Sequence, residues 1–106
     1  LFMNKVQKFL EENLFERKYT IKMLSADMGM SRTKFYSKMT EIIGKAPEYY
    51  ILAFKMDKAR TLLATQRYSV TEVATMVGYC DAKYFGKKFK EFYRVSPSKY
   101  IENVIG

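Results

Sequence analysis

The sequence contains no histidine, no tryptophan and a single cysteine, Cys80. Without histidine, the chain lacks the usual general base of a catalytic triad and the commonest ligand of transition metals. It also lacks a G-x-S-x-G motif and a glycine-rich phosphate loop. Carboxylates and tyrosines remain, so these absences close the common routes to catalysis rather than every route. We predict a domain that is not an enzyme and binds no metal, no other cofactor and no small molecule.

Glycine and proline are also scarce, with 5 and 2 residues among 106. Together with 48% hydrophobic and 28% charged residues, this composition predicts one folded domain. One cysteine cannot form an internal disulfide, and the sequence shows neither a secretory signal nor an apolar run long enough to cross a bilayer. These features favour a cytoplasmic location. The chain opens inside an apolar pattern, at Leu1-Phe2-Met3, which suggests a domain of a longer protein.

Acidic residues are the minority among the charged groups. The chain has 19 Lys and Arg against 11 Asp and Glu, a net charge of +8. This balance predicts an anionic partner. Charge alone does not distinguish DNA, RNA and acidic membranes.

Apolar residues recur at three- and four-residue steps through most of the chain, which is typical of amphipathic helices. Clean alternation over four or more residues, the sign of a strand, is missing. A residue suited to capping a helix precedes five of the periodic segments: Thr20, Ser31, Ser69, Asp81 and Ser96. The pattern predicts an all-α fold of seven helices at about 2–13, 21–28, 32–43, 47–65, 70–77, 82–93 and 97–104. The methionines, Met23 among them, are interpreted as core residues.

The chain contains an internal repeat. Residues 24–51 resemble residues 73–101, with Gly29 aligned to Gly78 at an offset of 49 residues and Phe35 aligned to Phe85 at an offset of 50. One residue is therefore inserted in a turn. Each unit is predicted to be a helix, a glycine-containing turn and a second helix that follows at once, the pattern of a helix-turn-helix. Plain helical hairpins are the alternative.

The basic residues concentrate in these units. Two segments, residues 31–46 and residues 81–94, each carry a net charge of +3. Together they account for +6 of the total of +8. Both segments hold the second, or recognition, helix of a unit. The helix between the units, about 47–65, would be roughly 28 Å long at 1.5 Å per residue. That length approaches the ~34 Å between successive major grooves on one side of DNA.

These features resemble the DNA-binding domain of AraC/XylS-type transcription regulators. The resemblance runs from about Thr20 to Ile101 and depends on L-S-A-D-M-G-M-S-R-T-K-F-Y-S-K-M, on S-V-T-E-V-A-T-M-V-G-Y-C-D-A-K-Y-F-G-K-K-F-K and on the closing V-S-P-S-K-Y. It implies one domain over 1–106, with helix-turn-helix subdomains at 1–46 and 66–106 joined by a linker helix at 47–65. It further implies double-stranded promoter DNA and RNA polymerase as partners, activation of transcription in bacteria, and a sensing domain elsewhere in the full chain. The segment F-M-N-K-V-Q-K-F-L-E-E-N-L also resembles output domains of AraC-type hybrid two-component systems, whose receiver lies outside these residues.

The resemblance assigns base contacts to the exposed faces of the recognition helices. The matched positions are Arg32, Thr33, Tyr36 and Ser37 in the first helix, and Lys83, Tyr84 and Lys87 in the second. Ala82 and Gly86 are also matched but offer little or no side chain. The predicted phosphate contacts are Lys38, Lys55, Lys88, Lys90 and Arg94. A phosphate contact is the alternative for Arg32, Lys83 and Lys87. Solvated surface is the alternative for Tyr36, Ser37, Lys38, Lys88 and Lys90.

The chain departs from the family pattern at Cys80, Gly86 and Arg94. Arg94 stands where the family usually has glycine after the second recognition helix. It either adopts a left-handed cap, at a cost of about 1 kcal/mol, or places its charge near the helix end and a phosphate. Gly86 weakens its helix. Two other functions stay open: a basic module that binds an acidic protein or a membrane surface, and a nonspecific nucleic-acid binder.

Overall fold

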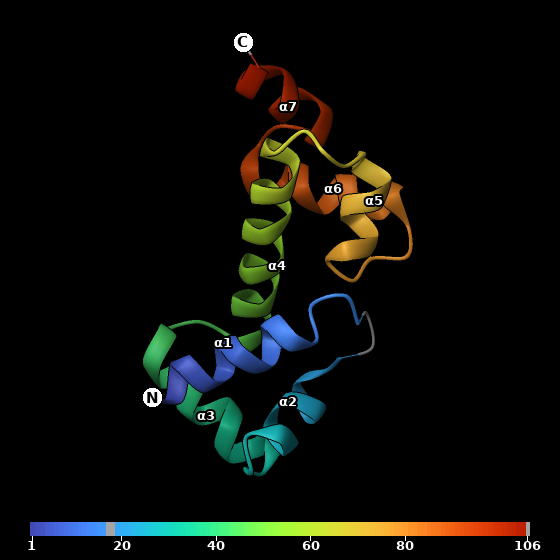
Figure 1. The fold of residues 1–106 in the computed structure, drawn as a ribbon. Coiled ribbons are helices and arrows are strands. Elements are labelled where there is room, and N and C mark those ends of the chain that lie inside the picture. The colour runs from blue at the N-terminus through green and yellow to red at the C-terminus, as the bar shows by residue number, and fades with distance from the viewer. Residues whose placement is uncertain (17–18, 106) are drawn as a thin grey trace.

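The computed structural model describes residues 1–16 and 19–105, which form seven helices and no strand (Figure 1). The helices are α1 Phe2–Glu12, α2 Ile21–Asp27, α3 Arg32–Ile43, α4 Pro47–Ala64, α5 Val70–Met76, α6 Ala82–Tyr93 and α7 Pro97–Ile105. The prediction of an all-α fold is confirmed, and each predicted helix end agrees within one residue. Within the described ranges, no helix is both long enough and apolar enough to cross a membrane.

Local capping chemistry determines where five of the helices begin. The side-chain oxygen of each predicted cap accepts a backbone N–H three residues later, or two residues later at Asp81: Thr20 from Met23, Ser31 from Lys34, Ser69 from Glu72, Asp81 from Lys83 and Ser96 from Lys99. At Ser69 the Glu72 carboxylate also accepts the Ser69 backbone N–H at 2.8 Å, which completes a capping box. Pro47 and Pro97 occupy the first positions of α4 and α7.

The two helix-turn-helix turns have the same backbone geometry. Gly29 and Gly78 adopt the left-handed region, with φ of 71° and 90°. In each turn the N–H after the glycine donates to a carbonyl five residues earlier, from Met30 to Ser25 at 3.0 Å and from Tyr79 to Ala74 at 2.8 Å. These bonds end α2 and α5 in the same way. The sequence repeat is therefore a structural repeat.

The inserted residue of the second turn is Cys80. Ser31 follows Met30 directly and caps α3, whereas Cys80 stands between Tyr79 and the cap Asp81. Cys80 is exposed, so the extra residue is accommodated on the surface without a change to either flanking helix.

Two separate hydrophobic clusters hold the molecule together. The first is built mainly from α1, α2 and α3, and its buried residues are Val6, Leu10, Tyr19, Ile21, Leu24, Phe35 and Met39. The second is built from α4, α5 and α6, and its buried residues are Met56, Ala59, Leu63, Val73, Ala74, Val77, Phe85 and Phe89. The prediction that methionines fill the core is wrong for Met23, which is 47% exposed because it lies on the outer side of the short helix α2.

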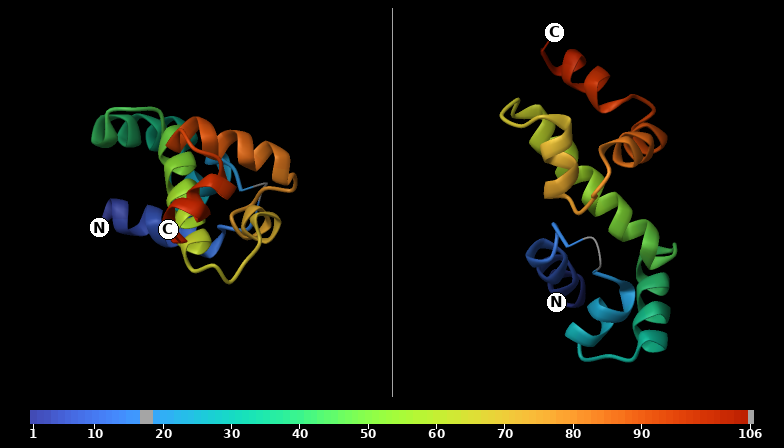
Figure 2. Two further views of the ribbon diagram at one scale, coloured as in Figure 1. Left: turned by 90° about the horizontal axis from the view of Figure 1, so that it is seen from above. Right: turned by 90° about the vertical axis from the view of Figure 1, so that its right-hand side faces the viewer.

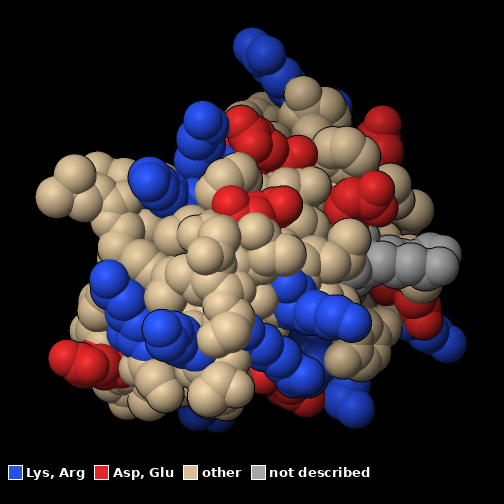
Figure 3. Space-filling model, turned by 90° about the horizontal axis from the view of Figure 1, so that it is seen from below, with Lys and Arg blue, Asp and Glu red and all other residues tan. Residues whose placement is uncertain are grey.

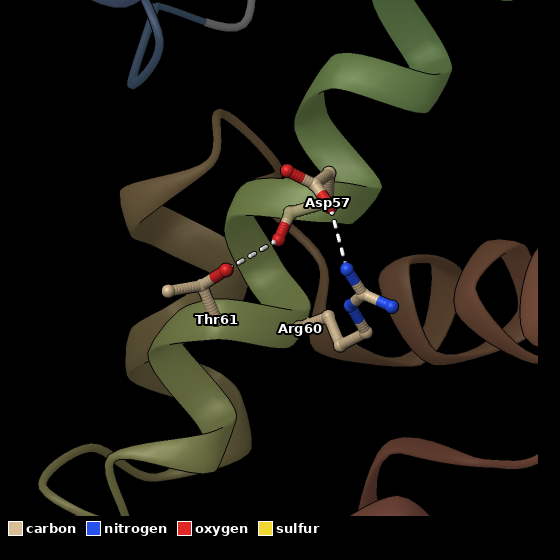
Figure 4. Close-up of polar contacts among 3 residues, drawn as sticks. All are labelled: Asp57, Arg60 and Thr61. Atoms are coloured by element: carbon tan, nitrogen blue, oxygen red, sulfur yellow. Dashed lines mark hydrogen bonds and ion pairs between the residues drawn. The ribbon is translucent and has the colours of Figure 1, made fainter.

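Helix α4 connects the two clusters. Its N-terminal half contributes Tyr50, Ile51 and Phe54 to the first cluster, and its C-terminal half contributes Met56, Ala59 and Leu63 to the second. Near the junction, Lys58 forms a 2.7 Å ion pair with Glu11 of α1. Further along α4, Arg60 donates to Asp57 at 2.8 Å (Figure 4), and its guanidinium lies 5.5 Å from the ring centre of Tyr93 in α6.

Arg94 adopts the left-handed cap that the sequence left as one of two alternatives. Its φ is 69°, and its N–H donates to the Lys90 carbonyl at 2.7 Å. At the equivalent end of α3, the N–H of Gly44 donates to the Thr40 carbonyl in the same way. A side chain other than glycine is strained in this conformation.

We expect the substitution Arg94→Gly to stabilise the domain by about 1 kcal/mol, because it removes this strain. Urea unfolding followed by circular dichroism measures the change. Arg94→Ala is the matched control, since it removes the charge and keeps the strain, and it should give no such gain. Equal stabilisation by both variants would show that the charge, not the backbone, sets the stability.

Candidate nucleic-acid interface

The predicted base-reading residues of the first unit lie together on the surface of α3. Phe35 and Met39 are fully buried beneath the helix, whereas the remaining residues from Arg32 to Thr40 are exposed. One open hollow on this surface is lined by Arg32, Thr33, Tyr36 and Ser37. Helical spacing therefore places a guanidinium, two aliphatic hydroxyls and a phenol on one exposed face.

Glu48 of α4 contacts this face and was not anticipated from the sequence. The Tyr36 hydroxyl donates to Glu48 Oε1 at 3.2 Å. Desolvation, followed by the nearby carboxylate, raises the pKa of Tyr36 above its ordinary value, which favours the protonated hydroxyl that donates to Glu48. An acidic residue in the first turn of a helix is common. That local signal does not reveal a partner twelve residues away on another helix.

In the second unit the structure brings Lys83 and Lys87 together on the exposed side of α6. Phe85 and Phe89 are buried beneath them. Tyr84 is 49% exposed but leans toward the preceding turn, where its ring centre lies 6.0 Å from that of Tyr79. Tyr84 is thus exposed and also in contact with the second turn.

The predicted phosphate contacts have unequal surroundings. Lys88 Nζ lies 5.5 Å from the ring centre of Tyr84 and 3.7 Å from the Glu91 carboxylate. Lys38 Nζ is 4.6 Å from the ring centre of Phe2. Lys90 and Arg94 are exposed and have no ion-pair partner within 1–16 and 19–105.

Lys55 differs from the other predicted phosphate contacts because it is partly buried. It lines a hollow at the second turn, with its Nζ 5.5 Å from the ring centre of Tyr79. Burial lowers the pKa of Lys55 and raises that of Tyr79. Lys55 therefore lies at the turn before α6.

The two recognition helices lie on the same side of the molecule. In both views of Figure 2, α3 and α6 occupy one edge, and α1 and α5 occupy the other. Seen from below, Lys and Arg side chains gather in the lower half of the view, and the carboxylates lie mainly above them (Figure 3). Both helices carry exposed basic residues, among them Arg32, Lys83 and Lys87, so the side that α3 and α6 share is the candidate surface for an anionic partner.

The first turn of α4 also reaches α6. The ring centre of Tyr49 lies 6.0 Å from that of Phe92, and Lys45 Nζ lies 4.2 Å above the Tyr49 ring. With the Tyr36–Glu48 hydrogen bond, this turn contacts both recognition helices. Among the residues that the structure describes, no three His, Cys, Asp or Glu side chains lie close enough together to hold a metal ion.

This arrangement is that of a tandem helix-turn-helix DNA-binding domain. Residues 24–103 match the family model of a helix-turn-helix domain, and the chain belongs to the AraC-type family. Domains of this family bind DNA in transcription regulators and are not enzymes. The resemblance identified in the sequence is thereby confirmed.

Two solved structures and one curated relative illustrate the similarity. The C-terminal domain of the two-component response regulator yesN from Fusobacterium nucleatum is 29% identical, with a TM-score of 0.85 over 93% of this chain and 96% of that chain. The DNA-binding domain of AdpA, solved in complex with a target DNA, is 28% identical, with a TM-score of 0.84 over 94% of this chain and 89% of that chain. Histidine kinase P4 of Formosa agariphila is 26% identical over 92% of this chain and 7% of its own length. The chain spans between 7% and 38% of the length of these curated relatives.

Gly86 is not required by packing within the domain. A Cβ built on Gly86 meets no atom within 4 Å, and the same is true of Gly29. The two glycines differ in backbone conformation, since only Gly29 has a positive φ, of 71°.

We expect Gly86→Ala to stabilise the domain by about 1 kcal/mol, because alanine has the higher helix propensity. Gly29→Ala should destabilise it by about 1 kcal/mol through left-handed strain, although the space around both residues is open. Thermal unfolding of the two variants measures these changes. A loss of stability in Gly86→Ala would contradict the open surroundings of that position.

Proposed function

We propose that the domain binds double-stranded promoter DNA sequence-specifically, with α3 and α6 in successive major grooves on one side of the duplex. The observation that carries the proposal is the placement of both helices on one side of the molecule, with polar and basic faces outward (Figure 2). A helix held in this way can enter the major groove and present side chains to base edges.

The dimensions of the domain are compatible with contact to two adjacent major grooves of DNA. Helix α4 has 18 residues and is therefore roughly 27 Å long. The longest dimension of the molecule is 45 Å, which accommodates recognition elements separated by the ~34 Å groove repeat. A monomer of this shape can contact two grooves without a partner subunit.

The residue chemistry supports base reading by α3. The Arg32 guanidinium can donate two hydrogen bonds to guanine, and the Thr33 methyl group can contact that of thymine. The Tyr36 and Ser37 hydroxyls can donate and accept hydrogen bonds. For the phosphates we assign Lys38, Lys90 and Arg94, which are exposed on or near the recognition helices.

The full protein is proposed to be a two-component transcription regulator that activates transcription through RNA polymerase. Support for the two-component assignment comes from similarity to the yesN response-regulator domain and to a histidine kinase. Because promoter DNA lies in the bacterial cytoplasm, we propose that location for this domain.

Selection of bound sites from random double-stranded DNA tests the proposal directly. We expect a selected sequence motif, and footprinting on the selected site should protect two patches about one helical turn apart. Equal affinity for that site, for heparin and for acidic vesicles at one salt concentration would instead support a general anion-binding module.

We expect Lys90→Ala to weaken binding to every DNA sequence and to reduce the slope of log K against log salt by about 0.9, because one phosphate contact is lost. Lys8→Ala is the matched control. It removes the same charge from an exposed position of α1, a helix on the opposite edge from α3 and α6 in Figure 2, and should leave the slope unchanged. Titrations at several salt concentrations measure the slopes, and equal slopes for both variants would exclude Lys90 as a phosphate contact.

We expect Arg32→Ala to cost roughly 1–3 kcal/mol of binding free energy and to relax the preference at one base pair of the first box. Binding to a set of operators that carry each single substitution measures this effect. A uniform loss across all operators would make Arg32 a phosphate contact.

A further inference from the structure

The two recognition helices can be compared position by position. Their N-caps, Ser31 and Asp81, and their buried phenylalanines, Phe35 and Phe85, match at an offset of 50 residues. The outward positions therefore match at the same offset. In α3 they hold Arg32, Thr33, Tyr36, Ser37 and Thr40, all exposed. In α6 they hold Lys83, Lys87 and Lys90, which are exposed, and Ala82 and Gly86, which are partly buried.

The outward face of α3 can distinguish bases. It carries one positive charge and four hydroxyl groups, of which those of Tyr36 and Thr40 donate to Glu48 Oε1 and to the Tyr36 carbonyl and keep their acceptor lone pairs. Hydroxyls accept as well as donate hydrogen bonds, so they can meet the amino groups of cytosine and adenine as well as base acceptors. The Arg32 guanidinium adds a planar donor pair of fixed geometry. These groups respond to the identity of a base pair.

The outward face of α6 lacks this capacity. It carries three ammonium groups, one methyl group and a glycine, and no side-chain acceptor. An ammonium is a strongly hydrated point charge on a flexible stem, which suits phosphate oxygens and tolerates different sequences. The neighbouring carboxylates are engaged, since Asp81 caps α6 and Glu91 lies 3.7 Å from Lys88.

Gly86 is central to this difference. It occupies the position of Tyr36, and the space around it is open, so no neighbour of the domain demands its small size. The middle of α6 thus presents bare backbone flanked by Lys83, Lys87 and Lys90. This face contributes charge without side chains that read bases.

We propose that α3 provides the sequence discrimination and that α6 provides sequence-independent affinity for the DNA backbone. The binding site then consists of one information-rich box and one degenerate box. This inference depends on the proposed function, because it divides the two roles within that DNA-binding surface.

The first test measures the affinity of the chain for the selected duplex and for all single base-pair substitutions of it. Substitutions in the first box should reduce affinity by about 5- to 150-fold at the contacted positions. Those in the second box should change it less than about 2-fold. Deleting the second box from the duplex should nevertheless lower affinity strongly and reduce the salt slope by up to about 3, one phosphate contact per lysine.

A grafting experiment adds base reading to α6. Ala82→Arg with Gly86→Tyr restores the groups of Arg32 and Tyr36 at the matched positions, and it should create a base preference in the second box while the first box stays unchanged. Ala82→Lys is the matched control, because it adds the same charge without the planar donor pair. It should raise affinity for all sequences without a new preference.

Two outcomes separate this inference from the proposed function. If the unmodified chain selects two equally informative boxes, the division of roles is wrong and sequence-specific binding stands. If it selects no motif at all, sequence-specific binding itself is wrong, and the division of roles is overturned with it.

Discussion

The structure depends on how α4 buries two nearly opposite faces along its length. Phe54 packs against the first cluster and Met56 against the second. Two residues of helix separate them by about 200° around the axis. The rotation between the two units is therefore set by the register of one continuous helix. Because α3 packs on α4 from the first unit and α6 from the second, this register also decides that both recognition helices lie on one side.

The first turn of α4 adds side-chain contacts to this backbone constraint. Glu48 accepts a hydrogen bond from Tyr36 of α3, and the ring of the neighbouring Tyr49 packs at a tilt against Phe92 of α6. The same turn of α4 therefore contacts both recognition helices and helps to fix their relative positions. The shared contact explains why two units with separate cores can present their outer faces as one surface. The Lys58–Glu11 ion pair, further along α4, connects the helix to α1 and lies partly exposed, so it contributes less than the buried clusters do.

Most of the fold was predictable from the sequence because its signals are local. The cap residues and turn glycines act within three to five residues, and each predicted helix end agreed within one residue. The predicted base-reading positions on α3 also lie together, since helical spacing alone brings them to one face. Contacts between distant residues were missed: Tyr36 with Glu48, Tyr49 with Phe92, and the partial burial of Lys55 against Tyr79. These depend on how whole helices pack, which no short pattern encodes. The exposure of Met23 has the same origin, because apolar character does not determine which side of α2 meets the core.

Ion pairs within the domain determine how much of the net charge of +8 is available to an anionic partner. Lys58, Arg60 and Lys88 each lie within 4 Å of a carboxylate, at Glu11, Asp57 and Glu91. Their charges are partly neutralised inside the domain. Lys83, Lys87 and Lys90 have no such partner among the residues that the structure describes, and they share the outer face of α6. The field available to an anion is therefore stronger beside α6 than the net charge of its segment alone implies. On α3 the corresponding face carries hydroxyls in place of most of those charges. The two copies of the repeated unit therefore differ in the chemistry of their outer faces. The hydroxyl groups of α3 are suited to base edges, and the ammonium groups of α6 are suited to phosphates.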